Sequence, residues 1–320
     1  LTVGALHADA AGSDFSLGYR LDLWGSDGHP SPATAHGRGI RRAIKPDLST
    51  AGGRQLYDPI HGHDEMVVPS RGTALPPGVQ VAAPPDRIAY VSGTTFAAVE
   101  VARRAVRIIE TLEPSVDRRY LPVAAKALLV HGTAFPEGVP YGIPTDRLVG
   151  HGPLTRDLAR GCSRSQATLL FTGDLAARET VTLPVPFPDE LAALTDLRRI
   201  SMTLAWFSPI NWNHRQYRRA KLTVDGPPEI PSKTRSTRGP DYHLTQRGTV
   251  QHRIIETSRA FAHDQLTLTV SCADQAGGFG GQVPFALAVS LEVGTGVNLD
   301  VYNLVTSRLR ERAQADTVAR

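Results

Sequence analysis

The chain has 320 residues, of which 41% are hydrophobic and 21% are charged. These proportions are typical of a globular protein, and they exclude disorder over the whole length. Lysine and arginine number 35 against 31 aspartate and glutamate residues, so the formal net charge is only +4. Short basic clusters are therefore interpreted as solvated surface, and no nucleic-acid partner is expected. No apolar run reaches the length of about 18 residues that a membrane span needs, so no membrane partner is expected either.

The cysteines, the histidines and the first residues of the chain indicate a cellular location and whether a metal or cofactor is expected. Cys162 and Cys272 make no disulfide framework and are expected to be buried, reduced thiols. The opening segment has no signal-peptide pattern, which together with the cysteine count predicts a cytoplasmic location. No cofactor and no metal are expected, because neither a CxxC nor an HExxH pattern occurs. The weak ligand-like cluster His61-Gly-His63-Asp64 is interpreted as a polar loop.

The first part of the chain mixes predicted strands with long loops. Residues 1–6 alternate and predict a strand, whereas residues 7–37 are rich in Gly, Ser, Asp and Pro and predict loops. Residues 45–53 predict a strand that leads into a turn at Gly52-Gly53. Residues 58–87 contain many prolines and glycines with little periodicity, which indicates a long surface insertion.

The strongest helix signal lies at residues 94–112. Apolar residues fall there at helical spacing: Ala97, Ala98, Val101, Ala102, Ala105, Ile108, Ile109 and Leu112. Thr94 and Thr95 are candidate N-caps, because a hydroxyl can accept a hydrogen bond from a free backbone N–H. Residues 120–130 predict a second, shorter helix that ends at His131-Gly132.

Beyond about residue 165 the sequence becomes β-rich. Seven short runs of β-forming residues are separated by turn residues, which predicts an antiparallel β-sandwich. These runs are 167–171, 179–185, 199–206, 220–224, 249–256, 265–272 and 285–293. Pro, Gly, Ser and Thr mark turn stretches at 226–240 and 273–282. A last amphipathic helix is predicted at about 299–314, with Leu299, Tyr302, Val305 and Leu309 on its apolar face.

One block of this sequence resembles a family motif. Tyr90-Val-Ser-Gly-Thr-Thr-Phe-Ala-Ala-Val99 resembles the Gly-Thr-Ser-(Met/Phe)-Ala-x-Pro serine motif of the subtilisin-like serine proteases, or subtilases. Thr95 stands where that family has its serine, and Val99 stands where it has proline. Four further blocks resemble subtilase segments in the family's order: 1–6, 44–53, 124–131 and 149–153. The part beyond 165 resembles the β-rich C-terminal extension of large bacterial subtilases. The similarity lies in its short β-rich runs separated by turn residues and in Leu204-Ala-Trp206.

The resemblance implies a fold and a domain plan. Residues 1–165 are expected to be the C-terminal half of a subtilisin-like α/β catalytic domain, with a mostly parallel sheet and helices. Residues 166–298 are expected to form a β-sandwich-like C-terminal domain, and 299–320 an amphipathic helix and tail. A half-domain would expose strand edges, so instability or aggregation of this chain alone is expected.

The resemblance also implies a chemistry. The activity would be serine-type endopeptidase hydrolysis through an acyl-enzyme, on a peptide or protein substrate, with Thr95 at the nucleophile position and Gly93 and Thr94 forming its turn. By this alignment the family's catalytic Asp, His and oxyanion Asn lie upstream of Leu1, so the missing N-terminal half is an expected partner and this chain alone is expected to be inactive. No base role is assigned to the five histidines of the early loops: His7, His29, His36, His61 and His63.

Two alternatives remain open on the residues alone. Thr95 is either a nucleophile served by an outside base or a residue that caps the helix. Correspondingly, the protein is either a protease or a catalytically dead subtilase relative that binds peptides or a partner protein.

Overall fold

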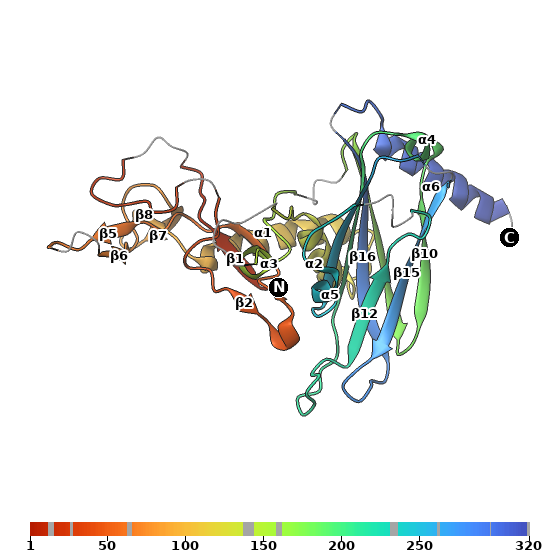
Figure 1. The fold of residues 1–320 in the computed structure, drawn as a ribbon, viewed down its shortest axis with the longest axis horizontal. Helices are drawn as coiled ribbons and strands as arrows, with labels where there is room; N and C mark the ends of the chain where they lie inside the picture. The colour runs from red at the N-terminus through yellow and green to blue at the C-terminus, as the bar shows by residue number, and fades with distance from the viewer. Residues whose placement is uncertain are drawn as a thin grey trace. The chain divides into compact units, whose positions relative to one another are not determined.

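The computed structural model describes residues 1–11, 16–25, 28–62, 66–136, 144–157, 162–230, 236–260, 263–294 and 296–318. It is a mixture of strands and helices in which most strand pairs are antiparallel (Figure 1). The chain divides into two units, each compact by itself. The first unit comprises Leu1–Val106 and Gly132–Arg156, and the second comprises Arg107–His131 and Asp157–Arg320. No described helix is both long and apolar enough to cross a bilayer.

The first unit is built from short strand pairs. Strand β1 (Val3–Leu6) pairs in parallel with β4 (Leu48–Ala51), in the register Val3 to Leu48. The remaining pairs are short and antiparallel: β2 (Gly37–Arg38) with β3 (Ile44–Lys45), β5 (Tyr57–Pro59) with β6 (Val67–Pro69), and β7 (Val79–Ala83) with β8 (Arg87–Val91). Two short helices, η1 (Ile40–Arg42) and α3 (Asp146–Val149), also belong to this unit. The strands predicted at 1–6 and 45–53 are thus confirmed.

The mostly parallel sheet expected for residues 1–165 is wrong for the described part of the chain. There, β1 and β4 form the only parallel strand pair, extended by a single parallel bridge between Ser49 and Pro153. The reason is local pairing between sequence neighbours. Segments of the insertion predicted at 58–87 contribute to two hairpins, β5–β6 and β7–β8, instead of supplying a further parallel strand.

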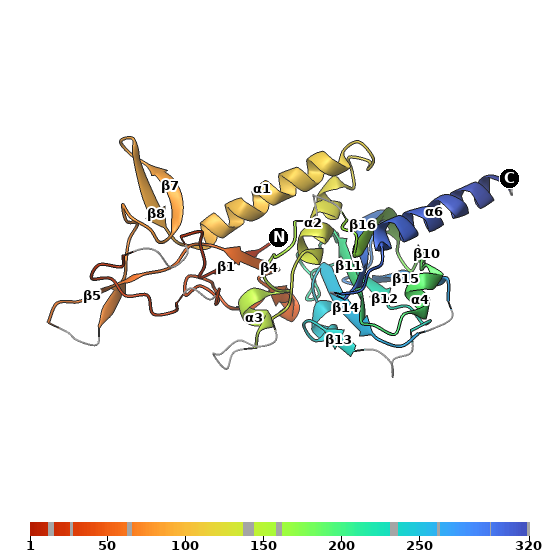
Figure 2. The same cartoon turned by 90° about the horizontal axis from the view of Figure 1, so that it is seen from above.

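The helix predicted at 94–112 is confirmed as α1 (Thr94–Leu112), one continuous helix (Figure 2). Its buried side chains include Ala97, Val101 and Ile108, at the spacing expected for one helical face. Val99 and Val106 are apolar but largely exposed, on a different face. The boundary between the two units falls inside this helix, after Val106.

The second unit contains two antiparallel sheets. A five-stranded sheet has the order β13-β14-β11-β16-β9, and a three-stranded sheet has the order β10-β15-β12. Their strands are β9 (Gln166–Ala176), β10 (Thr180–Pro186), β11 (Arg198–Trp206), β12 (Ala220–Asp225), β13 (Ser236–Arg238), β14 (Val250–Thr257), β15 (Gln265–Asp274) and β16 (Gln282–Val293). All seven predicted β-runs are strands. Strand β13 was not predicted, because it lies in the stretch at 226–240 that was interpreted as turn. Two one-turn helices, α4 (Asp189–Ala193) and α5 (Tyr242–Thr245), lie between strands.

Both sheets contribute to one buried apolar cluster. Along β11 the cluster takes every second residue, Ile200, Met202, Leu204 and Trp206, as the two-residue period of a strand requires. Strand β15 contributes Leu266, Leu268 and Val270 to the same cluster. The C-terminal helix α6 (Val301–Val318) adds Val301 and Val305. The helix predicted at 299–314 therefore exists, but Tyr302 and Leu309 of its predicted apolar face are exposed, because the helix docks through Val301 and Val305.

Helix α2 (Leu121–His131) covers the other face of the five-stranded sheet, against β11, β14 and β16. Small residues line that face of the sheet: Ser201, Thr203 and Ala205 on β11, with Ala286, Ala288 and Ser290 on β16. All are buried, so both strands are buried on consecutive residues, as expected for a sheet covered on two faces. The helix itself is buried almost all round, and it clusters with the second unit, although its residues lie inside the stretch 1–165.

Candidate functional site

The turn before α1 is held by backbone contacts with the end of β4. The N–H of Gly93 donates to the carbonyl oxygen of Gly52 at 2.8 Å. Gly53 lies so close to the same turn that an added Cβ would be 2.4 Å from the carbonyl oxygen of Val91. Both Gly53, at φ +84°, and Gly93, at φ +150°, adopt backbone conformations that favour glycine. The two sequence blocks that carry the family resemblance, 44–53 and 90–99, therefore meet in space.

Thr94 and Thr95 are the first two residues of α1, and Thr95 is exposed. Neither hydroxyl makes a hydrogen bond within the described part of the chain, so the predicted N-capping role is wrong for both. The first turn is held instead by Gly93, whose carbonyl accepts from the N–H of Phe96 at 3.2 Å. The hydroxyl of Thr95 therefore makes no hydrogen bond to a described residue, and the residue is exposed to solvent.

No described imidazole or carboxylate bonds to the hydroxyl of Thr95. His36, which is exposed, lines a hollow of about 330 Å³ together with Thr94, but no hydrogen bond joins them. His61 is exposed, while His63 and Asp64 of the same weak cluster lie outside the described residues. Among the described residues no group of histidines, cysteines and carboxylates could hold a metal ion. Among the described residues, Thr95 therefore has no group beside it that could act as its base.

His7 forms a buried pair that the sequence did not predict. Its Nε2 lies 2.8 Å from Oδ1 of Asp22, and its Nδ1 accepts the backbone N–H of Gln55 at 3.1 Å. Because Nδ1 accepts, the neutral ring carries its proton on Nε2 and donates it to Asp22. With both nitrogens occupied, the ring cannot take a proton from a nucleophile. Instead it fastens the chain after β1 to the chain after β4, and no local sequence pattern could have indicated this.

A second buried polar network lies between α2 and the five-stranded sheet. His131 Nδ1 is 2.7 Å from Thr203 Oγ1, and His131 Nε2 is 2.6 Å from Ser290 Oγ. Thr203 Oγ1 is also 2.6 Å from His252 Nδ1, and Ser290 Oγ is 2.7 Å from Thr168 Oγ1. The His131 residue is only 2% exposed and Ser290 is 0% exposed, so no substrate reaches this His–Ser pair. The network satisfies polar groups between helix and sheet.

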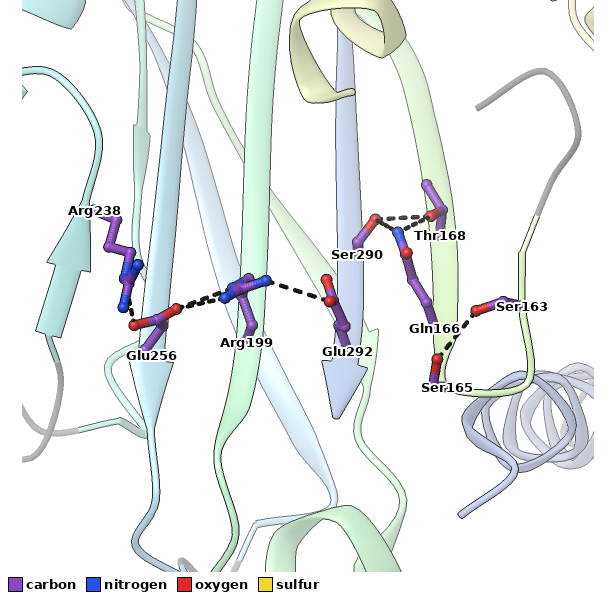
Figure 3. A network of polar contacts seen from close by, with 9 residues as sticks. All are labelled: Ser163, Ser165, Gln166, Thr168, Arg199, Arg238, Glu256, Ser290 and Glu292. Atoms are coloured by element: carbon purple, nitrogen blue, oxygen red, sulfur yellow. Dashed lines mark hydrogen bonds and ion pairs between the residues drawn. The ribbon is translucent and has the colours of Figure 1, made fainter. Parts of the chain in front are cut away.

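A row of ion pairs crosses one end of the five-stranded sheet (Figure 3). Glu256 on β14 joins Arg238 on β13 and Arg199 on β11, both at 2.8 Å, and Arg199 also reaches Glu292 on β16 at 3.3 Å. The strand register places Arg199 opposite both Glu256 and Glu292, whereas Arg238 reaches Glu256 diagonally, because Arg238 is opposite Ile254. All three contacts are cross-strand pairs that stabilise the sheet. The two arginines balance the two glutamates, which leaves no net charge for a ligand.

The two cysteines are both free thiols. Cys272 is buried, as predicted, whereas Cys162 is only half-buried and differs from the expectation in this respect. Burial raises the pKa of the Cys272 thiol to about 11, with a smaller effect from Asp274 and Glu179. Cys272 is therefore a protonated core residue and not a nucleophile at neutral pH.

Comparison with known proteins finds a protein of similar sequence, but no protein of known activity. No protein-family model matches this chain. The uncharacterized protein y4bN of Sinorhizobium fredii (strain NBRC 101917 / NGR234) is 23% identical over 351 residues, which cover 98% of this chain and 78% of that protein. Since that protein is itself uncharacterized, it carries no function over to this chain.

Proposed function

We propose that this chain is the C-terminal part of a subtilisin-like serine endopeptidase in which Thr95 occupies the nucleophile position. The observation that supports this most is the contact of the Gly52-Gly53 turn with Gly93, because it joins two separate motif blocks of the family around one helix start. Thr95 lies one residue inside that helix, with its side chain exposed. This is an accessible position for a hydroxyl that attacks a peptide carbonyl.

The proposed reaction needs groups from outside these 320 residues. Thr95 Oγ1 would attack the carbonyl carbon of the substrate while a base removes its proton, which gives a tetrahedral intermediate. The C–N bond would then break, with the amine leaving after it takes that proton from the base, and water would hydrolyse the acyl-enzyme to a carboxylic acid and free Thr95. The first N–H groups of α1 are suited to stabilise the oxyanion, because a helix N-terminus carries free donors and a positive dipole end. A histidine, an orienting carboxylate and a further oxyanion donor would come from the remaining part of the catalytic domain.

The exposed apolar residues of α1 fit this proposal. Val99 is 64% exposed and Val106 is 53% exposed. On this proposal, a second half of the domain would cover both side chains. For the second unit we propose the β-sandwich class, supported by two antiparallel sheets that share one apolar cluster.

The proposed location is the cytoplasm, which the two free thiols support.

The alternative is a catalytically dead subtilase relative that binds peptides or a partner protein. Two observations favour it: threonine replaces the family's serine, and no described base contacts Thr95. The first proposal predicts that a peptide binds at the start of α1 and is cleaved. The alternative predicts binding of a peptide or a partner protein through the β-rich second unit, without cleavage.

Cleavage by the protein expressed with the reading frame upstream of Leu1 separates the two proposals. If Thr95 is the nucleophile, Thr95→Ala should lower peptide cleavage by about a thousandfold or more, and Thr95→Ser should retain or raise it. Thr111→Ala is the matched control, because it removes an exposed threonine hydroxyl from the other end of the same helix. Absence of Asp and His motifs upstream, or equal cleavage by all forms, would refute the protease proposal. Peptide binding without cleavage would support the alternative.

A further inference from the structure

A second hollow of the first unit, of about 330 Å³, lies beside the turn that precedes α1. Three arginines line it, Arg20, Arg54 and Arg71, and we call it the arginine hollow. Ser92 and Phe96, which flank the Gly93–Thr95 segment in sequence, also line it. No aspartate or glutamate is among the described residues that line this hollow.

Only one of the three arginines has an acidic partner in the described structure. The side chain of Arg54 is 4% exposed, and its Nε lies 3.6 Å from Oδ1 of Asp9. Arg20 and Arg71 form no ion pair with any described carboxylate. Of the three positive charges that line the arginine hollow, one is therefore paired with a described carboxylate.

Arg20 has unused donor capacity. Its Nε donates to the carbonyl oxygen of Leu17 at 3.1 Å, but its Nη1 is buried without a hydrogen-bond partner among the described residues. A buried donor without a partner is unfavourable, and an arriving acceptor would remove that penalty. Of the acceptors in peptides, a carboxylate matches the planar guanidinium best, because two parallel N–H···O bonds can form.

The wall of the arginine hollow is fixed to the turn at Gly93. Ser92 Oγ donates to Oε1 of Gln55 at 2.9 Å, and Gln55 Nε2 donates to the carbonyl oxygens of Leu56 at 2.8 Å and Ser70 at 3.2 Å. Gln55, Leu56, Ser70 and Ser92 all line the hollow, so its shape is tied to the start of α1. Tyr90 and Phe96 add aromatic surface that suits the methylene groups of a side chain.

We infer that the arginine hollow binds a carboxylate of a peptide that lies along the start of α1. The carboxylate belongs either to an acidic side chain or to a free chain end. That the ligand is a peptide rests on the proposed function, whereas the preference for a carboxylate rests on the arginines alone.

Binding of short fluorescent peptides to the 320-residue chain tests this without requiring cleavage. One peptide pair differs only by glutamate against glutamine, and a second pair differs only by a free or amidated C-terminus. We expect the carboxylate form of at least one pair to bind about tenfold more tightly than its neutral form. The pair that shows the preference identifies the source of the carboxylate.

Three variants locate the effect. Arg20→Gln and Arg71→Gln should each reduce the preference for the carboxylate severalfold, and Arg87→Gln should leave it unchanged. Arg87 is the matched control, since it is an exposed arginine of β8 in the same unit but does not line the hollow. Circular dichroism of each variant confirms that it is folded.

Equal binding of carboxylate and neutral peptides would overturn the inference, as would an equal loss in all three variants, which indicates general charge attraction. If the preference is present while the Thr95 variants show no change in cleavage, the protease proposal fails and the carboxylate site stands. If the complete protease cleaves acidic and neutral peptides equally well, and binds them equally, only the carboxylate site fails.

Discussion

The two units of this chain differ in how they are held together. In the second unit, one buried cluster draws on both sheets and on α6, with Trp206 and Phe187 among its largest members. In the first unit the described buried apolar side chains are fewer, and they include Ile44, Leu48, Leu56 and Val101 beside the small cluster of Leu6, Leu148 and Val149. Close backbone approaches at glycines and polar pairs such as His7 with Asp22 add to these apolar contacts. We therefore expect the stability of the second unit to depend most on apolar burial, and that of the first unit to depend more on its backbone geometry.

Truncating the largest core residue should have the largest effect. Trp206 is fully buried, so Trp206→Ala should lower the free energy of unfolding by about 3–5 kcal/mol, through lost apolar burial and a cavity. Trp206→Phe is the matched control: it keeps most of the ring and removes an Nε1 that has no described hydrogen-bond partner. Urea denaturation of both variants checks this, and equal losses would contradict the core-based account of the second unit.

Glycine substitutions test the backbone-based account of the first unit. Gly53→Ala should destabilise the first unit by about 2–4 kcal/mol, because a Cβ there meets the carbonyl oxygen of Val91 and φ is positive. Gly93→Ala should cost only about 1 kcal/mol, since its Cβ would come no closer than 3.8 Å to Phe96. Limited proteolysis within residues 66–91 is the measurement. Similar cleavage rates for the two variants would show that close approach at Gly53 is not what holds this unit.

Removing the hydroxyl between the two buried histidines should have an intermediate effect. Thr203→Val keeps the shape of the side chain but takes away the partner of His131 Nδ1 and His252 Nδ1, so a loss of about 1–3 kcal/mol is expected. Thr223→Val on β12, where no hydroxyl bond is present among the described residues, should change stability by less than about 0.5 kcal/mol. Chemical denaturation of the two variants, followed by tryptophan fluorescence, compares them.

Substitution of Cys272 should have the smallest effect on stability near neutral pH, because the contribution of its thiol changes only at alkaline pH. The folded state raises the pKa of this thiol from 9.0 to about 11, so the folded protein holds the proton more tightly than the unfolded chain does. The resulting stability is fully present below pH 9 and is lost as the pH rises toward 11. Cys272→Ala should therefore show a shallower fall in urea midpoint over this range than the parent, and an equal fall in the two proteins would contradict this account.

Much of the second unit could be predicted from its sequence. Each of its seven predicted β-runs is a strand, because β-branched and apolar residues alternate there between clear turn residues. Strand β13 was missed because three polar residues, Ser236, Thr237 and Arg238, carry no such alternation, and their pairing depends on β14. Helix α1 was equally predictable, since its apolar residues repeat at the helical period.

The candidate site was predictable only in part. The serine-like motif predicted Thr95 as the nucleophile position. The place of Thr95 at an exposed helix start follows from the preceding turn at Gly93. The arginine hollow could not be predicted, because Arg20, Arg54 and Arg71 come from separate loops that carry no common motif. The pairing of His7 with Asp22 and Gln55 depends likewise on residues far apart in the chain.

The sequence by itself determined the local elements: the period of apolar residues specifies helix or strand, and glycine marks the turns that need unusual backbone geometry. Tertiary structure alone decided which elements share a core. Helix α2 shows why: apart from Lys126 and His131 it consists of apolar residues, and these lie on every side, so no single apolar face indicates a partner. It packs where Ser201, Thr203, Ala286 and Ala288 leave a surface of small side chains on the sheet. That surface exists only once β11 and β16 have paired in register, because the pairing alone places these residues on one face.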